Sequence, residues 1–185
     1  MPKIRRSSSA IHIHQSQKRC LRSIDVKPFP ALVVALNLVA AFAVLTSGSI
    51  LFMAGTFRPL PEIAVALLAF GGCLGAFEGA VHWGFTIDRP DVILPRANPL
   101  TDRRRAWLGG GALLWFWLAL CVGLLCSFKA GFLLEALGFA LQFAIERIAG
   151  RWGRLPPGYQ HIKLAFTVLV EIGLVLGALS PLGKV

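Results

Sequence analysis

The chain has 185 residues, of which 56% are hydrophobic and 15% are charged, and its formal net charge is +10. So apolar a composition leaves too little polar surface for an ordinary water-soluble domain, and it indicates a membrane protein. Nucleic-acid binders carry their basic residues on a folded polar face, whereas here these residues lie in a tail and in short loops. We therefore expect a lipid bilayer, and no nucleic acid, as their partner.

Residues 1–30 are basic and contain several serines, and Asp25 is their only acid. This composition predicts a disordered tail, because it offers little apolar material that could be buried on folding. Two interpretations of the tail stay open. It is either a retained cytoplasmic anchor or a cleavable mitochondrial transit peptide, which is also rich in Arg and Ser and poor in acids.

Five apolar stretches follow the tail and predict an all-α integral membrane bundle of five transmembrane helices in a single domain, residues 31–185. About 20 helical residues cross the hydrocarbon core, and the first three stretches exceed that length. The fourth has only about 16 residues, so a re-entrant hairpin is its alternative. The predicted helices cover residues 31–57, 63–87, 106–128, 130–145 and 164–182.

The number of lysines and arginines alternates between high and low from one gap between these stretches to the next. Seven precede the first stretch, the successive gaps hold one, five, one and four, and one follows the last stretch. By the positive-inside rule, this pattern predicts an N-terminus inside and a C-terminus outside. The count also favours five crossings, since otherwise Arg147, Arg151, Arg154 and Lys163 would lie on the outer side.

The second stretch combines glycines with two polar residues on one helical face. At 100° per residue, Gly71, Gly75 and Gly79 share this face with Glu78 and His82. Glycines at a spacing of four allow another helix to approach closely, so we assign them a helix-packing role. The polar pair is then expected to point into the bundle, where an ionisable group in a membrane is tolerated.

Polar residues also share one face of the fourth stretch and one face of the fifth. Depths are counted along each helix from its predicted inner boundary. They bring Glu78 and His82 of the second stretch to a depth similar to that of Gln142 of the fourth and Glu171 of the fifth, in the inner leaflet. Glu135 is left alone near the outer side. The candidate polar cluster comprises Glu78, His82, Gln142 and Glu171; the inward face of the fourth stretch comprises Gly131, Glu135, Gly138, Gln142 and Glu146.

Three functional hypotheses follow from this arrangement. The leading one is a non-enzymatic interaction or assembly subunit, which packs against itself, another membrane protein or a second copy, with the polar residues as interhelical contacts. The alternative is a small proton-coupled transporter or channel that uses Glu78, His82 and Glu171, because histidine titrates near physiological pH. The third is a haem or quinone redox protein. The chain has no CxxC pair, so neither a zinc site nor a dithiol redox centre is indicated. No cofactor and no metal site is predicted.

The segment FEGAVHWG, residues 77–84, resembles a signature of an uncharacterised multi-pass membrane family, domain of unknown function 3429, which includes transmembrane protein 69. The segments ALGFALQF and LPPGYQHIKLAFTVLVEIGLVLG resemble the last two helices of that family and the linker between them. The resemblance implies a bacterial or mitochondrial inner membrane and no known activity. The matching positions are Phe77, Gly79, Trp83, Gly84, Leu155, Pro156, Tyr159, Leu164 and Thr167.

The chain departs from the family pattern at three positions. Glu78 stands in place of a leucine, Ala80 in place of a glycine, and Gly158 in place of a tryptophan. A proton-handling role shared by the whole family would therefore rest on His82 and Trp83 more than on Glu78.

Overall fold

Five long helices make up the described part of the chain. The structure is a computed structural model, and it describes residues 31–55, 57–87, 99–151 and 159–181. No strand occurs within those ranges, so the predicted all-α fold is confirmed there. In chain order the helices are α2 (Ala31–Ala54), α3 (Pro61–Ile87), α4 (Pro99–Leu125), α5 (Phe128–Arg151) and α6 (Tyr159–Leu179).

All five helices are long and apolar enough to cross a membrane. Each contains a segment of 20 to 24 residues with a mean hydropathy between 1.5 and 2.1. Large apolar side chains also cover the outside of the bundle, as Leu36 and Trp117 illustrate with 60% and 61% of their surface exposed. Such a surface suits lipid and not water. The protein is therefore a multi-pass membrane protein.

Helix α5 is longer than the sequence pattern suggests. It begins two residues before the predicted stretch 130–145 and ends six residues after it. Its 24 residues extend over about 36 Å as one continuous helix, so this segment is not a re-entrant hairpin. Helix α6 likewise begins at Tyr159, five residues before the expected boundary. Both extensions carry polar residues that are buried inside the bundle, which hydropathy alone assigns to a loop.

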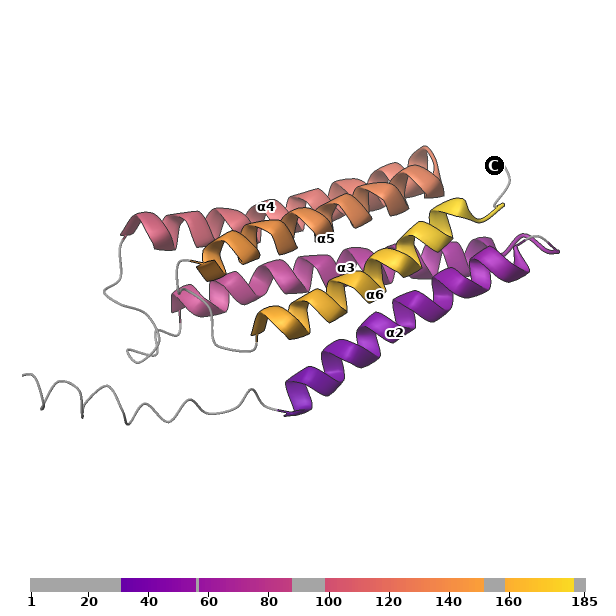
Figure 1. Ribbon diagram of the computed structural model, residues 1–185. Helices are drawn as coiled ribbons and strands as arrows, with labels where there is room; N and C mark the ends of the chain where they lie inside the picture. The colour runs from indigo at the N-terminus through magenta and orange to yellow at the C-terminus, as the bar shows by residue number, and fades with distance from the viewer. Residues whose placement is uncertain (1–30, 56, 88–98, 152–158, 182–185) are drawn as a thin grey trace, which may run out of the picture.

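The helices form a bundle in which α3, α5 and α6 all contact one another. Helix α4 covers α3 and α5, while α2 packs on α6 and α3 and touches neither α4 nor α5 within the described residues (Figure 1). The helices α2 and α6 begin, and α3 and α5 end, at the same end of the bundle (Figure 1). We call this the N-terminal end. Helix α6 ends at the opposite end, as an odd number of crossings requires.

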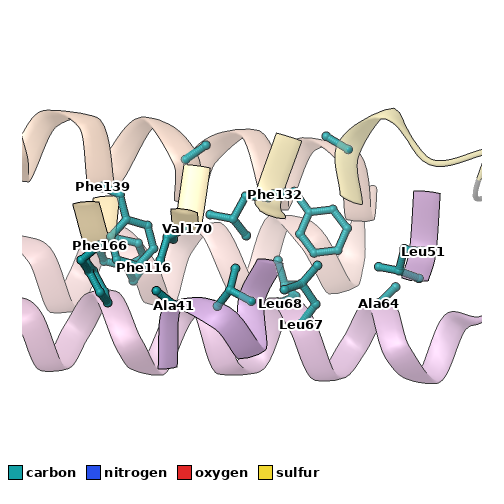
Figure 2. Packing of buried hydrophobic residues seen from close by; sticks show 14 residues of the cluster. Ala41, Leu51, Ala64, Leu67, Leu68, Phe116, Phe132, Phe139, Phe166 and Val170 are labelled. Atoms are coloured by element: carbon teal, nitrogen blue, oxygen red, sulfur yellow. The ribbon is translucent and has the colours of Figure 1, made fainter. Parts of the chain in front are cut away.

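Three phenyl rings from three helices pack together in the core. Phe116 of α4, Phe139 of α5 and Phe166 of α6 are at most 1% exposed and lie together (Figure 2). The ring centroids of Phe116 and Phe139 are 4.8 Å apart, and those of Phe139 and Phe166 are 6.1 Å apart. The ring of Phe116 fits over the bare backbones of Gly75 and Gly138, where a Cβ atom would collide with it.

Several predicted features fall outside the described residues. They are the tail 1–30, the segment 88–98 and the linker 152–158, which includes Leu155 and Pro156. The side chains of residues 83–87, among them Trp83, are likewise not described.

Candidate functional site

Five polar side chains from three helices meet near the N-terminal end of the bundle. Glu78 and His82 come from α3, Glu146 from α5, and Tyr159 and Lys163 from α6. The exposed fractions of the four ionisable residues Glu78, His82, Glu146 and Lys163 are only 5%, 9%, 2% and 4%. We call these five residues the charged cluster.

Glu146 stands at the centre of this cluster. Its Oε1 atom lies 3.1 Å from Nε2 of His82 and 3.4 Å from Nζ of Lys163. Its other oxygen, Oε2, accepts a hydrogen bond of 3.2 Å from the hydroxyl of Tyr159. The Lys163 ammonium also donates to Oε2 of Glu78, so that it bridges the two carboxylates. One oxygen atom of Glu146 is therefore shared by two groups that can carry a positive charge.

Helical spacing explains how short segments bring these groups together. Glu78 and His82 are four residues apart on α3, and Tyr159 and Lys163 are four residues apart on α6, so each pair lies on one face. Because α3 runs toward the N-terminal end and α6 runs away from it, the two pairs face each other in antiparallel order (Figure 1). Glu146 of α5 completes the arrangement from a third side.

The charges of the cluster nearly balance. Two carboxylates and one ammonium leave one negative charge when His82 is neutral, and no net charge when His82 is protonated. Buried ions are tolerated only when they are paired and hydrogen-bonded, which is the case for both carboxylates here. Adding a proton to His82 or removing one from it therefore changes the balance of forces on the Glu146 oxygen that Lys163 also contacts.

The structure separates the four residues of the predicted cluster into two groups. Glu78 and His82 belong to the charged cluster. Gln142 lies about one helical turn from Glu146 and donates from Nε2 to the carbonyl oxygen of Gly75 at 3.1 Å. Glu171 lies eight residues beyond Lys163 on α6, or about 12 Å along the axis.

Lys163 is the residue that sequence reasoning assigned differently. The sequence pattern places it among the basic residues of the gap before the last stretch, because a lysine ordinarily ends an apolar segment at the membrane surface. The structure corrects this, since Lys163 lies in the second turn of α6 and is paired inside the bundle. One signal could have found it: Lys163, Thr167 and Glu171 are spaced by four residues and share a helical face. The sequence pattern places Glu146 on the inward face of its helix but outside the predicted polar cluster.

The glycines of α3 lie against helices of the same chain. A Cβ atom at Gly71 would be 3.2 Å from Cδ of Glu135 in α5, and one at Gly79 would be 3.3 Å from the carbonyl oxygen of Gly109 in α4. Gly75 accommodates Phe116, as described above. Among the residues that carry the family resemblance, Phe77 is exposed and Tyr159 belongs to the charged cluster.

Metal coordination has no obvious place in this arrangement. Within the described ranges, no group of three or more His, Cys, Asp or Glu side chains is positioned to hold a metal ion.

A family model described as a protein of unknown function, DUF3429, matches residues 27–179, which include all five helices and every residue of the charged cluster. No curated protein and no solved structure matches the chain.

Proposed function

The chain belongs to the DUF3429 family of proteins of unknown function. From its charged cluster we propose that it conducts protons across the membrane, as a small proton-coupled transporter or channel. The observation that carries this proposal is the burial of Lys163 between Glu78 and Glu146, with His82 on the same Glu146 oxygen. Ionisable groups inside a membrane domain are costly, and they characteristically mark ion pathways and proton relays.

The shared oxygen atom suggests how a proton would be coupled to a change in structure. When His82 is protonated, it competes with Lys163 for Oε1 of Glu146, and Lys163 is left to pair more strongly with Glu78. When His82 is neutral, Lys163 is, among the described residues, the only cation in contact with both carboxylates. Because His82 and Glu78 lie on α3 whereas Lys163 lies on α6, each change of pairing alters the forces between these helices. Proton binding can therefore bias two arrangements of the bundle.

The glycines of α3 do not by themselves favour an assembly role over transport. The hypothesis of an interaction subunit allowed the small residues to pack within the chain or against a partner, and those of α3 are covered by α4 and α5 of the same chain. Interaction with another membrane protein or with a second copy stays a prediction without a surface assigned to it. Transport involves no chemical conversion of a substrate, so the proposal remains a non-enzymatic one.

We propose an energised membrane as the location, namely the bacterial cytoplasmic membrane or, alternatively, the mitochondrial inner membrane. A proton-coupled protein needs a proton gradient, which these membranes maintain. We also propose that the N-terminal end of the bundle faces the inside. With Lys163 assigned to α6, fifteen basic residues still belong to that side and three to the other.

A flux measurement with two cluster variants tests this proposal. In liposomes that contain the purified protein, Glu78→Gln and His82→Ala should each lower proton flux about a hundredfold or more, as expected when a positioned proton-transfer group is removed. The matched control is Glu62→Gln, which alters an exposed carboxylate near the other end of α3 and should leave the flux unchanged. Folded variants of Glu78 and His82 that conduct like the wild type would refute the role of the cluster.

A further inference from the structure

A row of buried oxygen atoms leads away from the charged cluster into the other half of the bundle. Among the described residues, the buried side-chain polar atoms that have no hydrogen-bond partner belong to four residues, all of them on α5 and α6. We call these residues the polar row. The atoms are Oγ1 of Thr167, Oε1 of Gln142, Oε1 of Glu171 and both carboxyl oxygens of Glu135.

The row advances in regular steps along the bundle axis. On α6, Thr167 and Glu171 follow Lys163 at intervals of four residues, which is about 6 Å for each step. On α5, Gln142 lies about 6 Å before Glu146, and Glu135 lies about 10 Å further. A water molecule that bonds to two oxygen atoms spans about 5.5 Å between them. Measured from the contact of Lys163 with Glu146, Glu171 lies about 12 Å along the axis, between the levels of Gln142 and Glu135. Single water molecules therefore have the right size to join successive levels of the row.

Glu135 forms the far end of this row. Its exposed fraction is 0%, and its carboxyl group lies over the bare backbones of Gly71 and Gly72 on α3. A Cβ atom at Gly72 would be 3.3 Å from Oε1 of Glu135, so the glycines leave room for this carboxyl group. Gly71 precedes His82 by eleven residues, as Glu135 precedes Glu146. The parallel helices α3 and α5 thus hold one acidic site at each end of the row.

Unpartnered oxygen atoms in a protein interior are rare, and native proteins commonly satisfy them with bound water. We propose that water molecules occupy the polar row and carry protons between the charged cluster and Glu135. This inference rests on the proposed function and specifies its route. The row provides the polar steps that a proton needs in the half of the bundle that contains Glu135.

The same contacts select protons over larger cations. Lys163 already pairs with both carboxylates at the entrance of the row, so a metal ion that approaches from the cluster would have to displace its ammonium group. A proton can pass along hydrogen bonds without the movement of a whole ion past this ammonium group. Each residue of the polar row also offers only one or two oxygen atoms, whereas Mg²⁺ or Ca²⁺ takes six or more ligands.

Two variants of the polar row test the route in the same liposomes. Thr167→Val and Glu135→Gln should abolish proton flux, whereas Thr167→Ser keeps the hydroxyl group and should retain it. Thr46→Val is the matched control, because the Thr46 hydroxyl bonds to its own helix on the exposed side of α2. If Thr167→Val and Glu135→Gln conduct like the wild type while Glu78→Gln does not, the route is wrong and the proposed function stands.

Hydration of the row can be measured without any flux, which separates the two proposals. Water-edited solid-state NMR in lipid should show polarisation reaching Thr167 and Glu135 faster than the buried apolar side chain of Val170. A wild-type protein that conducts no protons but shows this transfer would overturn the proposed function and keep the hydrated row. Equal transfer rates at Thr167, Glu135 and Val170 would overturn the row.

Discussion

Replacing Lys163 with methionine should lower the free energy of unfolding by about 3–5 kcal/mol, the range measured when one partner of a buried ion pair is removed. Methionine preserves most of the length and apolar volume of the lysine stem, so the loss reports on the charge. Without the ammonium group, the buried carboxylate of Glu78 would lose its ion-pair partner, and Glu146 would keep its contact with His82 but lose that with Lys163. This is the largest effect that we expect from a single substitution.

The measurement is reversible unfolding in mild detergent, with Lys129→Met as the matched control. Lys129 lies near the start of α5 and is exposed, so its replacement should change stability by less than about 1 kcal/mol. Adding Glu78→Gln to Lys163→Met should recover part of the loss, because one uncompensated carboxylate is removed. Equal stability of the Lys163→Met and Lys129→Met proteins would show that the cluster carries no buried ion pair.

Gly173→Leu should destabilise the protein by about 3 kcal/mol or more, at the upper end of the range for overpacked sites. A Cβ atom at Gly173 would lie 2.7 Å from the carbonyl oxygen of Val44 and 2.8 Å from Cα of Leu45. These are backbone atoms of α2, so no side chain can turn away to make room. The leucine would therefore push α2 off α6, which is the main helix that holds it in the bundle.

Ala165→Leu is the control for this second prediction, since it adds a similar side chain at an exposed position of the same helix. Thermal unfolding in detergent should show a clear loss for Gly173→Leu and little change for Ala165→Leu. A distance measured between spin labels on α2 and α6 should also increase in the Gly173→Leu protein. An unchanged distance and stability would contradict the close contact of Gly48 with Gly173.

Much of the fold could be predicted because a membrane helix leaves a simple signal. Long apolar stretches predicted five helices, and all five are present. The boundaries of α5 and α6 were less predictable, because both helices continue through polar residues. Glu146 and Lys163 neutralise each other inside the bundle, whereas hydropathy reads each of them as the end of an apolar segment. A hydropathy scale scores each residue by itself and cannot account for this pairing, because the pairing depends on the packing of α5 against α6.

The sequence predicts which helical faces carry the polar residues of the candidate site, but not which residues pair with one another there. The glycine spacing of α3 correctly indicated that Glu78 and His82 point inward, and the structure buries both. Which groups they meet depends on the rotation and axial offset of α5 and α6. A shift of one helical turn decides whether His82 faces Gln142 or Glu146, and both residues lie on the same face of α5. The sequence pattern does not determine that offset.

Proton uptake by wild-type protein in liposomes is the most direct test of a proton-coupled function. A potassium diffusion potential, negative inside, would drive protons inward, and a pH-sensitive dye trapped in the liposomes would report their entry. We predict acidification well above that of protein-free liposomes and of liposomes that contain the doubly substituted Glu78→Gln, His82→Ala protein. Acidification by the wild-type protein at the protein-free rate would contradict this account of the charged cluster.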